Sequence, residues 1–136
     1  MRALQEAGMP YDPDMVVWFY TEDRKIHPYE GIQNIAKNKE LDAVVCYNDQ
    51  NAMGVIRALE ALDLKIPDDV SVTGYDNFYM ANQSDFRLTS IAHPQEKLGE
   101  MAAELLLDLV VNGENSEKQK IMIEPELVEG TSCKRR

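Results

Sequence analysis

The sequence lacks several features that would assign it to whole classes of protein. No apolar run approaches the roughly 20 residues that a membrane-spanning helix needs, and the opening residues, MRALQEAGMPYD, lack the apolar core of a signal peptide. The two cysteines, Cys46 and Cys133, have no metal-type spacing. We therefore expect a cytoplasmic protein with reduced thiols, no metal site and no membrane contact. The abrupt opening also suggests a fragment of a longer chain.

Basic residues are scarce too. Lys and Arg number 14 against 24 Asp and Glu, which gives a formal net charge of −10. Binding to nucleic acid needs clustered basic side chains. The one basic cluster, Lys134-Arg135-Arg136, closes the sequence and is simply explained as a solubilising tail. We therefore expect one acidic domain over 136 residues that does not grip DNA by itself.

Catalytic motifs are also missing. No Gly-rich phosphate loop follows a predicted strand, and no GxSxG, HExxH or paired-cysteine motif occurs. The two histidines, His27 and His93, lie in different segments. A nucleophile, a base and an electrostatic stabiliser cannot be assembled into one site, so we predict no enzyme and no cofactor.

What the sequence does contain is an alternation of strand-like and helical segments. Short apolar runs predict buried strands at residues 15–20, 41–47, 70–74 and 88–92, with a last strand at 121–128 interrupted by Pro125. Apolar residues at three-four spacing predict helices at 2–7, 28–38, 49–62 and 94–111. This order predicts an α/β fold with a mainly parallel sheet flanked by helices.

Polar residues follow the predicted strands. Arg24, the pair Asn48 and Asp49, the pair Asp76 and Asn77, and His93 each come after a strand. Parallel strands end at one edge of a sheet, so these side chains should gather there. Carboxylate, amide and guanidinium groups suit neighbouring hydroxyls, so we predict a sugar-type site with Asn48, Asp76, His93 and Arg24.

Each of these residues also has a structural interpretation. Asp49 could cap the following helix, Asn48 could satisfy turn amides, and Asp76 with Asn77 could only form a turn. Arg24 could be a solvated loop cation, and His93 could shape the strand exit before a proline. The aromatic residues that could cover one side of a sugar ring could instead be packing residues: Trp18, Tyr20, Tyr47 and Tyr75.

Three ordered motifs carry a resemblance to a known family. The run DAVVCYNDQNAMGVIRALEALDLKIPDDVSVTGYDN is followed by LTSIAHPQEKLGEMAAELLLDLV and by ELVEGTSC. Over residues 1–133 the chain resembles the effector-binding domain of LacI/GalR-type transcriptional repressors, which is similar in fold to periplasmic sugar-binding proteins. The His-Pro pair also resembles hybrid repressors with a GntR-type head, such as arabinose repressors.

The resemblance implies that residues 1–136 are the C-terminal lobe of a type I periplasmic-binding-protein-like domain. Helix 94–111 would pack on a first lobe that, like the DNA-binding head, is not in this sequence. Asn48 and Asp76 match positions that contact effector, and His93 falls where relatives often have a glutamine. The loop around Arg24 matches a contact region. Asn77 replaces the second aspartate of the family's GYDD, which leaves the role of that position open.

The implied function is ligand-gated control of DNA binding. A small-molecule effector, expected to be a sugar, would bind between two lobes and act through its differential affinity for two states. Relatives form homodimers partly through this lobe, and the apolar stripe from Leu98 to Leu109 would pack on a neighbouring copy. The alternatives are an enzyme or phosphoacceptor receiver on a similar scaffold, and a sugar-binding lobe that serves transport.

Overall fold

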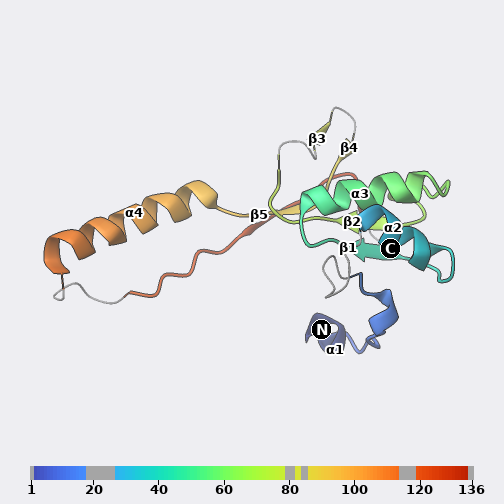
Figure 1. Cartoon of the computed structure of the whole chain (residues 1–136), viewed down its shortest axis with the longest axis horizontal. Coiled ribbons are helices and arrows are strands. Elements are labelled where there is room, and N and C mark those ends of the chain that lie inside the picture. The colour runs from blue at the N-terminus through green and yellow to red at the C-terminus, as the bar shows by residue number, and fades with distance from the viewer. Residues whose placement is uncertain (1, 18–26, 79–81, 84–85, 114–118, 135–136) are drawn as a thin grey trace.

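Helices and strands alternate along the chain. The computed structural model describes residues 2–17, 27–78, 82–83, 86–113 and 119–134. Its elements, in chain order, are α1 (Arg2–Glu6), the 3-10 helix η1 (Pro13–Met15), α2 (Pro28–Ala36), β1 (Ala43–Val45), α3 (Asp49–Glu60), β2 (Ser71–Thr73), β3 (Asn82–Gln83), β4 (Phe86–Arg87), β5 (Ser90–Ala92), α4 (Gln95–Asn112) and β6 (Glu126–Val128). They form an α/β fold with a small parallel sheet (Figure 1).

Parallel pairing occurs where the apolar runs predict it. β1 pairs in parallel with β2, with Val44 opposite Val72. The same alignment continues beyond β2, because Thr73 forms a parallel bridge with Thr89 and the Gly74 N–H donates to the Thr89 carbonyl at 3.0 Å. The ends of β1 and β2 and the start of β5 therefore point the same way.

The other strand pairs run in opposite directions. β3 pairs with β4, and β5 pairs with β6, both antiparallel. Among the described strands the pairing is thus mixed. The prediction of a mainly parallel sheet holds only for β1 with β2 and for the bridge between Thr73 and Thr89. The second antiparallel pair follows from the connection, because α4 leads the chain away from β5 and the segment after it returns beside that strand (Figure 1).

The core lies between the parallel strands and two helices. The apolar residues of α3 recur at three-four spacing, as predicted, so one face of the helix is buried. α2 packs against α3. The buried apolar residues are Ile32, Cys46, Ala52, Val55, Ile56, Ala58, Leu59, Val70, Val72 and Leu88. This cluster supports β1 and β2 from the side of α3.

Two predicted strands differ from the structure. The apolar run predicts a strand at residues 15–20, but Met15 ends η1. This 3-10 helix starts at Pro13 because the Asp12 carboxylate accepts the Asp14 N–H at 2.9 Å and Pro13 fixes its own φ. Residues 18–20 lie outside the described residues. The last strand begins at Glu126 rather than at residue 121, directly after Pro125, which cannot donate a ladder hydrogen bond.

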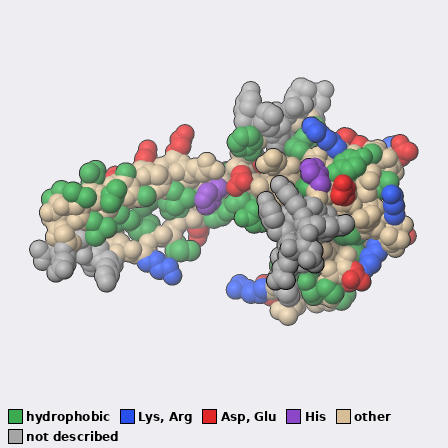
Figure 2. Space-filling view, in the orientation of Figure 1, with side chains coloured by type: hydrophobic (Ala, Val, Ile, Leu, Met, Phe, Trp, Pro, Cys, Tyr) green, Lys and Arg blue, Asp and Glu red, His purple; other side chains and the backbone are tan. Residues whose placement is uncertain are grey.

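Helix α4 reaches away from the other helices and strands (Figure 1). None of its residues is buried, and hydrophobic side chains gather along it in Figure 2. The most exposed of them are Leu106, Leu107, Leu109, Val110 and Val111. No helix in the described part of the chain is both long and apolar enough to cross a membrane. Packing of α4 on a first lobe or on a second copy stays a prediction.

The buried face of α3 makes a stability prediction. Leu59 is 0% exposed, whereas Leu127 on β6 is 57% exposed. We expect Leu59→Ala to lower the free energy of unfolding by about 2–5 kcal/mol, because it leaves a cavity in the core. The matched change Leu127→Ala should lower it by less than about 1 kcal/mol. Urea unfolding followed by circular dichroism measures both, and equal losses would contradict this description of the core.

Candidate functional site

The turn after β2 has an unusual backbone. Asp76 has φ 100° and Asn77 has φ 50°, a left-handed region that aspartate and asparagine enter more readily than most residues. The Asp76 N–H donates to the Ile91 carbonyl at 3.0 Å, and the Tyr75 carbonyl accepts the Asp49 N–H at 2.9 Å. The turn is therefore held between the start of α3 and β5.

Asn48 caps the helix that follows β1. Its backbone is extended, and its side-chain oxygen accepts the N–H of Asn51 at 2.9 Å, which satisfies one free donor of the first turn of α3. The prediction that Asp49 is the cap is wrong by one position, since Asp49 is the first residue of the helix. Asn48 is half-buried and lies where β1 ends.

The Asp49 side chain is buried and braces the turn. It is 2% exposed. Its Oδ1 accepts the Ser90 hydroxyl at 2.6 Å, and its Oδ2 accepts the Phe78 N–H at 2.5 Å. Ser90 in turn accepts the Asn77 N–H at 3.1 Å. The positive end of the α3 dipole adds to the stabilisation of this carboxylate. Asp49 is thus a brace between segments, a role that its sequence position alone does not indicate.

Gly74 makes this arrangement possible. A Cβ atom at this position would collide with Oδ1 of Asp49 and would lie 2.7 Å from Cδ2 of Leu88. The end of β2 can approach the buried carboxylate only because this residue has no side chain.

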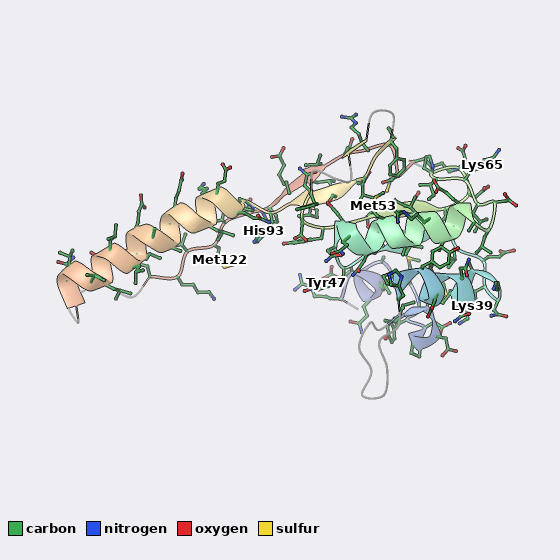
Figure 3. All side chains as sticks on the ribbon, turned by 45° about the horizontal axis from the view of Figure 1, so that its top comes forward. Lys39, Tyr47, Met53, Lys65, His93 and Met122 are labelled. Carbon is green, nitrogen blue, oxygen red and sulfur yellow. The ribbon has the colours of Figure 1, made fainter. Side chains whose placement is uncertain are left out.

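Asp76 and His93 border one cavity of about 530 Å³. The His93 ring is exposed beside Tyr75, whose hydroxyl lies 3.3 Å from Nδ1 of His93, within hydrogen-bond distance. Figure 3 shows His93 where the chain leaves the sheet for α4. The lining residues are Asp76, Asn77, Phe78, Ala92, His93, Pro94, Gln95, Glu96 and Lys97. The cavity therefore presents carboxylate, amide, imidazole and ammonium groups.

The structure brings together some of the predicted site residues. Asp76 and His93 share the cavity, while Asn48 is not among its lining residues. Arg24 lies outside the described residues, as do Trp18 and Tyr20. Sequence reasoning did not select Phe78, which lines the cavity with an exposed ring. No pattern in the sequence singles that residue out.

A second cavity, of about 380 Å³, lies beside β1. It is lined largely by apolar side chains of residues 15–17, α2 and β1, with no charged side chain among the lining residues. Nearby, burial and then the negative charge of Asp49 raise the pKa of the Cys46 thiol to about 12. The thiol is therefore protonated at neutral pH, which makes it a poor nucleophile. In the described part of the chain, no three His, Cys, Asp or Glu side chains are grouped to hold a metal.

The chain matches a known protein family over nearly its whole length. The model of the periplasmic binding protein-like domain matches residues 2–133. An arabinose metabolism transcriptional repressor from Halalkalibacterium halodurans is 29% identical over 94% of this chain and 36% of its own. The transcriptional repressor PurR from Photorhabdus laumondii is 38% identical over 97% of this chain and 38% of its own. The chain thus spans less than half the length of these relatives.

Solved structures agree with the sequence matches. A transcriptional regulator CelR in complex with cellobiose superimposes with a TM-score of 0.81 at 30% identity, over 96% of this chain and 39% of its own. A LacI family regulator from Enterococcus faecium with bound ribose gives 0.79 at 30% identity, over 97% of this chain and 48% of its own.

The close approach at Gly74 predicts opposite effects for two glycine substitutions. Gly74→Ala should lower the free energy of unfolding by about 1–3 kcal/mol, because the added methyl group displaces Asp49 or Leu88. Gly99→Ala in α4 meets nothing within 4 Å. It should raise stability by up to about 1 kcal/mol through helix propensity. Urea unfolding measures the free energy of unfolding of both variants. A Gly74→Ala variant as stable as the wild-type protein would contradict the close packing at this position.

Proposed function

The chain belongs to the periplasmic binding protein-like domain family, and we propose that it is the sugar-sensing C-terminal lobe of a transcriptional regulator. The family members it matches are the effector-binding domains of LacI-family regulators. Its relatives are transcriptional repressors rather than enzymes. The observation that carries the proposal is the shared cavity of Asp76, which follows β2, and His93, which follows β5.

The chemistry of this cavity suits a polyhydroxyl ligand. The Asp76 carboxylate can accept hydrogen bonds from two neighbouring hydroxyls, and the His93 imidazole can donate or accept. The exposed ring of Phe78 supplies an apolar surface for one side of a sugar. We include Asn48 at the end of β1, whose Nδ2 group remains a donor when its oxygen caps α3. Arg24 completes the proposed set from the family resemblance.

The proposed mechanism also needs the first lobe, which would face this one. The effector would bind in a cleft between this type I lobe and a first lobe, and α4, with its exposed leucines, would pack on that first lobe. Closure of the cleft around the sugar would favour one of two states and so change the DNA affinity of a linked head domain. We propose that the regulator works as a cytoplasmic homodimer that contacts DNA only through this head.

Titration calorimetry tests the proposal with ribose, cellobiose, lactose and L-arabinose on the protein in its full natural length. We expect saturable binding of at least one sugar. Asp76→Ala should weaken it about tenfold or more, because a hydrogen bond to a charged group contributes about 1.5–3 kcal/mol.

The matched control is Asp69→Ala. The Asp69 carboxylate also accepts a backbone N–H, that of Lys65 at 2.8 Å, but it is exposed and does not line the cavity. Its loss should leave sugar affinity unchanged. Equal affinities of the wild-type protein and the Asp76→Ala variant, or no binding of any sugar, would contradict the proposed function.

A further inference from the structure

One buried carboxylate joins three elements beside the cavity. Asp49 is the first residue of α3, and its two oxygens accept hydrogen bonds from Phe78 and Ser90, which lie 29 and 41 residues further along the chain. Asp49 is 2% exposed and Ser90 is 1% exposed. Neither side chain can reach a ligand in the cavity, and neither is among its lining residues.

The turn that this carboxylate holds is the one that carries Asp76. Three consecutive N–H groups of the turn donate hydrogen bonds to β5 or to Asp49. The Asp76 N–H donates to the Ile91 carbonyl, the Asn77 N–H to the Ser90 hydroxyl and the Phe78 N–H to the Asp49 carboxylate. Asp76 and Asn77 both have positive φ, which is unfavourable for residues with a side chain. Such a backbone persists only where its surroundings fix it.

We propose that Asp49 and Ser90 are a positioning pair that fixes the turn at residues 75–78 and thereby sets the affinity of the cavity through Asp76. This inference rests on the proposed function. The pair does not touch the ligand, and it acts by holding the Asp76 carboxylate where ligand hydroxyls meet it.

The chemistry of the brace requires a carboxylate. Both partners, the Phe78 N–H and the Ser90 hydroxyl, are donors, and Asp49 supplies one acceptor oxygen to each. An asparagine of the same shape offers one acceptor and one NH2 donor group, so Asp49→Asn can keep only one of these bonds. Either the Phe78 N–H or the Ser90 hydroxyl hydrogen then loses its acceptor. We expect this variant to weaken sugar binding about tenfold or more. Ser90→Ala, which is milder, removes the acceptor of the Asn77 N–H and should also weaken binding.

A stability effect alone can be separated from positioning. Val55→Ala in the buried face of α3 lowers stability without touching the turn, so it should leave affinity unchanged. Asp49→Asn should lower affinity in the wild-type background but add little to Asp76→Ala, because both act through the same carboxylate. A double variant whose loss equals the product of the two single losses would overturn the proposal.

The experiment combines calorimetry with hydrogen exchange on the protein in its full natural length. Ribose, cellobiose, lactose and L-arabinose are titrated into the wild-type, Asp49→Asn, Ser90→Ala and Val55→Ala proteins. Amide exchange of Asn77 and Phe78 is measured without sugar. The proposal expects faster exchange at Phe78 or at Asn77 in Asp49→Asn, depending on which partner the asparagine oxygen keeps, and faster exchange at Asn77 in Ser90→Ala. It expects no change at either amide in Val55→Ala.

The outcomes separate the two claims. If the wild-type protein binds none of the sugars, the proposed function fails, and the exchange of the two amides still decides whether Asp49 and Ser90 hold the turn. If the wild-type protein binds a sugar and Asp49→Asn binds it equally well, the positioning role is overturned. Unchanged exchange at both Asn77 and Phe78 in Asp49→Asn overturns it whether or not a sugar binds.

Discussion

The parallel alignment of β1, β2 and the start of β5 determines where the functional groups of this chain lie. β1 and β2 pair directly, and beyond β2 the N–H groups of Gly74 and Asp76 bond to the carbonyls of Thr89 and Ile91. Because these segments run the same way, the residues that follow them meet at one edge. An antiparallel β2 would place Asp76 at the opposite end of the sheet from His93.

The polar residues at this edge of the sheet have different structural roles. Asn48 satisfies the first turn of α3, Asp49 braces the neighbouring turn, and Asp76 faces the cavity. Burying the Asp49 charge is costly unless each oxygen is hydrogen-bonded, and here both are. The Asp49 carboxylate fits beside β2 only because Gly74 has no Cβ atom that would collide with it. Asn48 and Asp49 thus stabilise the fold beside the cavity that Asp76 lines.

The sequence predicted the elements better than their contacts. Apolar spacing identified α3, and the pairing of β1 with β2 followed from the apolar runs before Asn48 and Asp76. The role of Asp49 could not be predicted, because its partners lie far along the chain and become neighbours only after folding. The 3-10 helix at Pro13 was missed because the apolar run after it dominated the pattern, although Asp12 before a proline is a recognised turn signal. The identity of the ligand could not be predicted, because the proposed cleft would be completed by another lobe.

The most direct measurement is a crystal structure of the protein in its full natural length with a bound sugar. We expect sugar hydroxyls about 2.7–3.2 Å from the Asp76 carboxylate and from the His93 imidazole, in the cavity that both line. Asp49 should remain bonded to Phe78 and Ser90 and make no contact with the sugar. A sugar bound elsewhere, or a direct bond from Asp49 to the sugar, would contradict the account.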